Sequence, residues 1–136
     1  MRKWHTWIAA FAIGVMTTAC GTDLVDMREQ INALNAVQNG ALMVDVRTPE
    51  EVAQGSFDGA INVPHGEIVA GLAALGVDKK RPIVVFCHSG NRSEKAANAL
   101  EAAGYSLVID GGGYSELRAV EHALLTQRDS ASSDNT

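Results

Sequence analysis

Short, mainly apolar runs alternate along this chain with stretches of helical periodicity. The clearest run is Pro-Ile-Val-Val-Phe at 82–86, and similar runs lie at 41–46, 60–63 and 106–109. Strands that lack a polar alternation are typical of a parallel sheet that is covered on both faces. The alternation therefore predicts an α/β fold, with a mainly parallel central sheet of about five strands and helices on both of its faces.

The segments between these runs carry helix signals. Apolar residues in 23–38 recur every three or four positions and predict an amphipathic helix. Thr48, followed by a proline and by a glutamate at the third position, predicts a helix start. Further helices are expected over 67–75, 92–103 and around 117–124. Active sites of such folds lie at the carboxyl ends of the strands.

Length and composition bound the kind of protein. With 136 residues, 46% of them hydrophobic, the chain has the size and composition of one globular domain. Aromatic residues make up 5% and are not interleaved with basic ones, which argues against nucleic acid as a partner. We expect the domain to span 21–128 and the polar residues 129–136 to form a disordered tail.

The first twenty residues have the layout of a secretory signal. Arg2 and Lys3 precede an apolar stretch at 7–15 that is too short for a transmembrane helix, and small residues lead up to Cys20. This end resembles a bacterial lipoprotein cleavage site, at which Cys20 would be lipidated and would anchor the mature chain to the membrane. Thr17 stands where that site usually carries leucine.

An uncleaved N-terminal anchor and ordinary signal cleavage are the alternatives. In each case we expect the protein at the periplasmic side of a bacterial cell envelope, either lipid-anchored or secreted.

Charge and cysteine content restrict the chemistry. Without residues 1–19 the chain has 9 basic and 16 acidic residues, a net charge of −7, so an anionic substrate must be captured by local geometry. The two cysteines are Cys20 and Cys87. If Cys20 carries a lipid, Cys87 has no disulfide partner, and a lone thiol in an oxidising compartment indicates that its reactivity is used.

Cys87 directly follows the clearest strand, and the loop CHSGNRS at 87–93 leads into a helix. Such a short loop turns backbone N–H groups inward and forms an anion-binding cradle, for which Gly90 permits the necessary backbone angles. The helix N-terminus and Arg92 favour the thiolate, and thiols in such settings have pKa values lowered from about 8.5 to roughly 3.5–7.5. This arrangement suits attack on a phosphate ester or on a sulfane sulfur.

The loop resembles the catalytic loop of the rhodanese family, C-x-x-G-x-R-S, at each specified position. Cysteine phosphatases use C-x5-R, which is one residue longer, so the shorter loop favours sulfur. Residues 43–64 resemble a second rhodanese segment, D-V-R-x-x-x-E-[FYV]-x-x-G-H-I-x-G-A-x-N-[IV]-P, with Ser56 and Phe57 in place of His-Ile. Residues 110–114 resemble the family's G-G-x-x-x-W region without its tryptophan, and the resemblance covers about 24–126.

The resemblance implies a rhodanese-like three-layer fold and a thiosulfate sulfurtransferase with Cys87 as nucleophile. The Cys87 thiolate would take the outer sulfur of thiosulfate or a similar donor as a persulfide and release sulfite. Cyanide, or a small or protein thiol in the cell, would then accept the sulfur. No metal or organic cofactor is needed. The expected substrate-binding residues are His88, Ser89, Gly90, Asn91, Arg92 and Ser93.

Several side chains near this loop have more than one interpretation. His88 is a base, a lining of the pocket mouth, or a solvent-exposed residue. Asp45 and Arg47 form a solvated strand end or, as the resemblance implies, brace the active-site loop. Glu51 is expected to pair with Arg47 or to serve the helix start. Glycines 111–113 lack the lysine of a P-loop and are expected to form a turn near the rim of the site.

Two rival functions stay open at this point. One is a non-catalytic persulfide carrier that passes sulfur to a partner and turns over poorly with free cyanide. The other is a cysteine phosphatase or arsenate reductase, against which the loop length speaks. The histidines have no metal-ligand spacing, so no metal site is expected.

Overall fold

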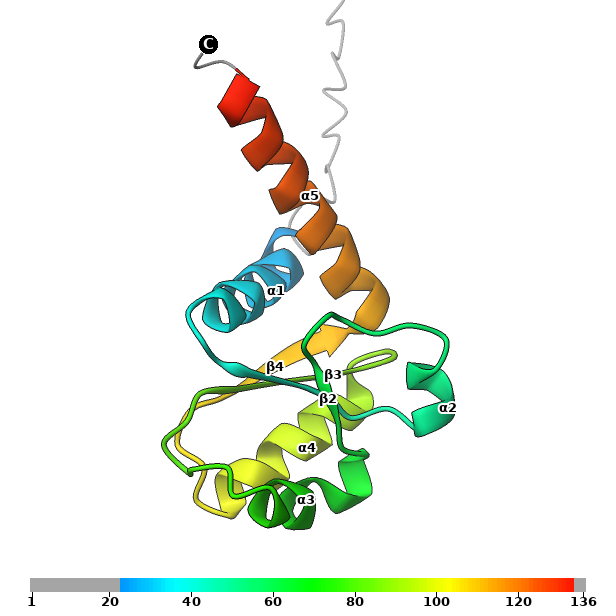
Figure 1. Ribbon diagram of the computed structural model, residues 1–136, viewed down its shortest axis with the longest axis vertical. Helices are drawn as coiled ribbons and strands as arrows, with labels where there is room; N and C mark the ends of the chain where they lie inside the picture. The colour runs from blue at the N-terminus through cyan, green and yellow to red at the C-terminus, as the bar shows by residue number, and fades with distance from the viewer. Residues whose placement is uncertain (1–22, 134–136) are drawn as a thin grey trace, which may run out of the picture.

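Four parallel strands form the central sheet of the protein, in the order β2-β1-β3-β4 (Figure 1). The computed structural model describes residues 23–133. The mainly parallel sheet is confirmed, with four strands in the described part of the chain rather than about five. Each of the four corresponds to one of the apolar runs of the sequence: β1 (Leu42–Asp45), β2 (Ile61–Asn62), β3 (Ile83–Cys87) and β4 (Val108–Gly113).

Helices cover both faces of the sheet and complete the three layers. One face is covered by α1 (Asp23–Gln38) and α5 (Tyr114–Ser133), and the other by α3 (Ile68–Ala74) and α4 (Asn91–Ala102), as Figure 1 shows. The short helix α2 (Pro49–Val52) follows β1, and the 3-10 turn η1 (His65–Glu67) precedes α3. The expected helices are confirmed, α1 with the same limits.

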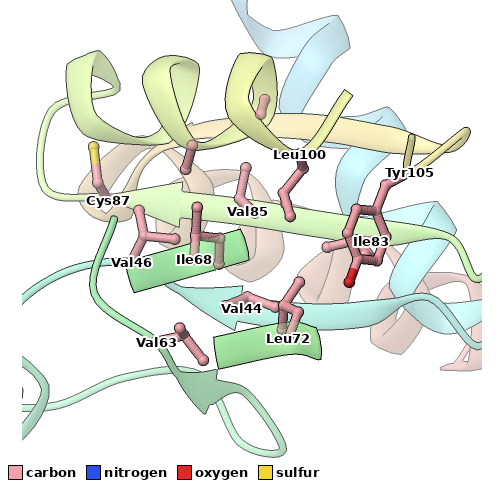
Figure 2. Packing of buried hydrophobic residues seen from close by; sticks show 12 residues of the cluster. Val44, Val46, Val63, Ile68, Leu72, Ile83, Val85, Cys87, Leu100 and Tyr105 are labelled. Carbon is pink, nitrogen blue, oxygen red and sulfur yellow. The ribbon is translucent and has the colours of Figure 1, made fainter. Parts of the chain in front are cut away.

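The alternation of side chains along β3 divides the core in two. Val85 and Cys87 point to the side of α3 and α4, while Val84 and Phe86 point to the side of α1 and α5. Figure 2 shows the first of these clusters, in which Cys87 is the residue nearest the start of α4. Because burial of each large aliphatic side chain contributes roughly 1.5–3 kcal/mol, β3 is held rigidly from both sides, and so is the thiol at its end.

The polar end of the chain differs from expectation. Helix α5 continues to Ser133, so the prediction of disorder is wrong for 129–133. The hydroxyl groups of Ser130, Ser132 and Ser133 donate to carbonyl oxygens three or four residues earlier, at 2.9–3.0 Å. Extending an existing helix requires only one residue to be fixed for each new hydrogen bond, so the helix continues without burying its side chains.

The N-terminal predictions lie outside the described residues. These predictions concern the signal at 1–20 and the lipidation of Cys20. The last three residues of the predicted tail, 134–136, also lie outside the described residues. Within 23–133, none of the helices has the length and apolar character needed to span a bilayer.

Candidate active site

Cys87 is the last residue of β3 and lies at the carboxyl end of a central strand. Its residue surface is completely buried, at 0% exposure. The ladder between β3 and β4 is irregular here, because Cys87 pairs with Gly113 after a register shift that follows Val85. Such a bulge bends the strand end locally, and here the bend comes where the chain leaves the sheet for the loop at 87–93.

The loop from Cys87 to Ser93 curls back over the sulfur atom. Gly90 has φ +93°, in the left-handed region, and this turns its N–H group toward Cys87 Sγ at 3.0 Å. Cys87 Sγ donates to the hydroxyl oxygen of Ser93 at 3.6 Å, and that hydroxyl donates to the Gly90 carbonyl at 2.9 Å. The predicted cradle of inward backbone donors is therefore formed at Gly90, where the backbone angle favours glycine.

The same contacts determine the protonation of the thiol. Burial raises the pKa of Cys87, but hydrogen bonds from the Ser93 side chain and from the backbone of Ser93, Ser89 and Gly90 outweigh it and lower the pKa overall. The direction agrees with the sequence prediction. The largest favourable causes are neutral donors, which include backbone groups at the start of α4, and the charge of Arg92 also interacts favourably with the thiolate.

Arg92 is bound to a carboxylate of the protein itself. Its Nη1 and Nη2 atoms donate to Glu51 Oε2 and Oε1, both at 2.7 Å. Glu51 Oε2 also accepts from the Thr48 N–H at 2.9 Å, and the Glu51 N–H donates to the Thr48 hydroxyl at 3.3 Å. These bonds lower the pKa of Glu51 to about 2, the bond from Arg92 most strongly.

This Glu51–Arg92 bridge ties the first turn of α2 to the first turn of α4. The predicted helix start at Thr48 is confirmed as a capping box. The alternative pairing of Glu51 with Arg47 is wrong, because the salt bridge of Glu51 is made with Arg92 and that of Arg47 with Asp45. Arg92, expected to bind a substrate anion, is thus already paired.

Asp45 and Arg47 form a buried ion pair, with side-chain exposures of 1% and 5%. Arg47 Nε and Nη2 donate to the Asp45 carboxylate at 2.9 and 2.6 Å, and Nη2 also donates to the Gly55 carbonyl at 2.7 Å. The Ser56 hydroxyl donates to Asp45 Oδ2 at 2.7 Å, and the Tyr114 ring stacks 4.4 Å from the guanidinium carbon of Arg47. The interpretation as a solvated strand end is therefore wrong.

The contacts of this pair also show what it supports. Within the described part of the chain, neither side chain hydrogen-bonds to residues 87–93; their bonds hold the connection between α2 and β2. The direct brace of the catalytic loop is instead the bridge from Glu51 to Arg92. Ser56, which stands in place of the family's histidine, contributes a hydroxyl donor to Asp45.

The remaining loop residues lie at its outer rim. His88, Ser89 and Asn91 are exposed, whereas Ser93 is buried beside the sulfur. No hydrogen bond joins the His88 ring to Cys87 in the described structure, so its interpretation as a base gains no geometric support. Residues 23–133 contain no group of three His, Cys, Asp or Glu side chains arranged to hold a metal ion.

The glycine run at 111–113 belongs to β4 and packs against the catalytic loop. A Cβ atom on Gly113 would approach the His88 carbonyl oxygen to 3.0 Å, and the Gly112 carbonyl lies 3.5 Å from the Ser93 hydroxyl. The run therefore lies at the rim of the site, as expected, although it forms the end of a strand. Small residues are needed here because the loop backbone comes so close.

Comparison with known proteins agrees with this geometry. Residues 22–119 match the family model described as Rhodanese-like domain. The chain belongs to the rhodanese-like family. This family member is 35% identical to thiosulfate sulfurtransferase PspE of Escherichia coli over 74 residues, 54% of this chain and 71% of the relative. It is 36% identical to thiosulfate sulfurtransferase GlpE of Pseudomonas aeruginosa over 86 residues, 62% of this chain and 74% of the relative.

A solved structure of a relative shares the fold. The rhodanese-like domain superposes on a rhodanese with anions from E. coli with a TM-score of 0.54 and 34% sequence identity, over 57% of this chain and 91% of the other. The fold expected from the apolar runs and from the loop motif is thus the fold of this family.

One contact at the candidate site of this rhodanese-like domain was not predicted from the sequence. Glu51 and Arg92 follow β1 and β3, which are neighbours in the sheet. Carboxyl ends of adjacent parallel strands meet at one edge of a sheet, so the two side chains come together although 41 positions separate them. The order of the strands was the signal that could have identified the pair.

Proposed function

We propose that the protein is a thiosulfate sulfurtransferase, which moves a sulfane sulfur from thiosulfate or a similar donor to a thiophilic acceptor through a persulfide on Cys87. The observation that carries this proposal is the hydrogen bond from the Gly90 N–H to Cys87 Sγ at 3.0 Å, inside a loop too short for the C-x5-R phosphate site. The names of the two sulfurtransferase relatives support the same activity.

The reaction follows from the position of the sulfur. The Cys87 thiolate attacks the outer sulfur of the donor, a new S–S bond forms, and the S–S bond of the donor breaks with its electron pair leaving on sulfite. The N–H groups of Ser89 and Gly90 favour the thiolate, and on this proposal they also stabilise the negative persulfide sulfur. Cyanide or a thiolate then takes that sulfur and restores the Cys87 thiolate, so no proton and no cofactor is needed.

A persulfide carrier is the second candidate. Cys87 has 0% exposed surface, so a donor or an acceptor reaches its sulfur only when the residues around it move. His88 and Ser89 are exposed at the loop rim next to it. A partner protein that binds this rim would open it more effectively than free cyanide. This burial favours the persulfide carrier as the second candidate. The geometry of the site gives no support to a phosphatase or an arsenate reductase.

Thiocyanate formation by the full-length chain tests the enzyme directly. With thiosulfate and cyanide we expect turnover in the wild type and in Cys20→Ser, and only background in Cys87→Ser. The Cys20→Ser variant is the matched control, because it makes the same substitution at the other cysteine. Equal turnover in Cys87→Ser would exclude Cys87 as the nucleophile. Absent turnover with persulfide formation on Cys87 would identify the carrier.

We also propose that the chain is anchored at the periplasmic side of the cell envelope through a lipid on Cys20. The small residues before Cys20 and the apolar stretch preceding them support this location. Cells grown with an alkyne-tagged fatty acid should label the wild-type protein and not Cys20→Ser. Membrane-bound protein without label would indicate an uncleaved N-terminal anchor instead.

A further inference from the structure

The groups that touch the reactive sulfur carry no charge. Gly90 N–H and the Ser93 hydroxyl lie 3.0 and 3.6 Å from Sγ, and the backbone at Ser89 contributes a further donor. These dipoles favour a single negative charge on sulfur. A donor whose other end is also anionic, such as the sulfonate of thiosulfate, would need a cation beside the loop as well.

Arg92 is the cation in the first turn of α4, and Glu51 neutralises it. Both terminal nitrogens of the guanidinium are bonded to the two oxygens of one carboxylate at 2.7 Å. The two side chains are about equally exposed, 27% and 31%, so their charges reach the solvent at the loop together. A donor that approaches the loop therefore meets an ion pair with no net charge.

Two further charged groups, Arg47 and Glu116, do not restore a positive field at the site. Arg47 is tied to Asp45 and to the Gly55 carbonyl. The Glu116 carboxylate lies over Gly113, so close that a Cβ atom at this glycine would collide with it, on the same side as the His88 carbonyl. The rim of the site therefore adds negative charge.

We infer that Glu51 selects the sulfur donor by charge: it masks Arg92, so that donors with one negative charge or none, such as alkyl thiosulfonates and alkyl persulfides, are used in preference to dianionic thiosulfate. This inference rests on the proposed sulfurtransferase function and names the substrate class of the same site. With an alkyl thiosulfonate the Cys87 thiolate takes the outer sulfur, and the electron pair of the broken S–S bond leaves on the sulfinate.

The first experiment measures the charge at the loop through the rate of Cys87 alkylation, which does not depend on catalytic turnover. Iodoacetamide and iodoacetate attack the same thiolate and differ by one negative charge. In Glu51→Gln the Arg92 charge is unmasked, and we expect the iodoacetate-to-iodoacetamide rate ratio at Cys87 to rise about fivefold at low salt. In Arg92→Gln the ratio should fall, and in the double variant it should return close to that of the wild type.

The variants separate charge from structural damage. Glutamine still satisfies the capping-box pattern with Thr48, and Glu50→Gln is the matched control, because it removes the same charge from the neighbouring exposed residue of α2. Damage to the loop would change both alkylation rates together and leave their ratio unchanged. A ratio that does not move in Glu51→Gln, or moves equally in Glu50→Gln, would overturn the inference.

Sulfur transfer by the full-length chain then tests the donor class. The wild type should show a higher kcat/KM with methanethiosulfonate than with thiosulfate. Glu51→Gln should raise kcat/KM about fivefold for the monoanion and, because the donor charge is doubled, about 25-fold for thiosulfate. Equal gains for both donors, or a loss for thiosulfate, would contradict selection by charge. Charge-dependent alkylation without transfer from either donor would instead overturn the proposed function.

Discussion

At the scale of the residue, the state of Cys87 depends on short contacts with neutral groups. Burial opposes the thiolate, and the donors at Ser93, Ser89 and Gly90 more than compensate, so the pKa of Cys87 is lowered. A lowered pKa means that the thiolate stabilises the folded state at pH values above the ordinary thiol pKa, and that this contribution is lost as the pH falls through the folded-state pKa. The motif predicted the direction, and the structure identifies the donors.

The Ser93 hydroxyl should therefore control the pH dependence of Cys87 reactivity. We expect the rate of iodoacetamide alkylation to rise with pH to a midpoint below the ordinary pKa of a cysteine thiol. In Ser93→Ala that midpoint should move upward by about one pH unit, because a hydrogen bond to the charged form is lost. Ser106→Ala, a change in an exposed serine bonded to Lys79, should leave it in place. A midpoint unaltered in Ser93→Ala would contradict the assignment.

At the scale of the element, the structure follows the sequence where periodicity is strong. The spacing within 23–38 and the cap at Thr48 are local signals, and both elements appear as expected. Predictions failed where the deciding interaction is not local. Glycines 111–113 indicated a turn, yet they extend β4 beside β3. They are packed closely there, because Cβ atoms on them would meet the Val85 carbonyl, the Gln30 amide and the Glu116 carboxylate.

Helix α3 contains another glycine, Gly71, that is required by a tertiary contact. Gly71 weakens the helix by propensity, but a Cβ atom there would lie 2.5 Å from Val63 Cγ1, at the end of the segment that follows β2. In Gly71→Ala we expect a loss of about 1–3 kcal/mol in the free energy of unfolding, measured with urea, because the contact is overpacked. Combination with Val63→Ala should recover part of that loss. Purely additive effects of the two changes would refute this packing.

At the scale of the whole molecule, strand order brings together what lies far apart in sequence. The Glu51–Arg92 bridge joins the two halves of the chain because β1 and β3 are adjacent. From sequence alone, Arg47 was the nearer and more natural partner for Glu51. Proximity in sequence predicts the wrong partner here, because Arg47 forms a buried ion pair with Asp45. No periodicity in the sequence indicates that pair.

The outer part of α5 should contribute little to the stability of the domain. Figure 1 shows this end of the helix pointing away from the sheet, and its side chains from Asp129 to Ser133 are exposed. Removal of 129–136 should shift Tm by no more than about 3 °C. Leu117→Ala, in the fully buried part of the same helix, should cost about 2–5 kcal/mol. A large loss on truncation would show that the tail packs in solution.

The central claim is that Cys87 carries sulfur, and intact-mass analysis of the full-length chain after incubation with thiosulfate or methanethiosulfonate tests it most directly. We predict a gain of one sulfur atom in the wild type and in Cys20→Ser, removed again by cyanide, and no gain in Cys87→Ser. A wild-type chain that remains folded and gains no sulfur from either donor would contradict the account.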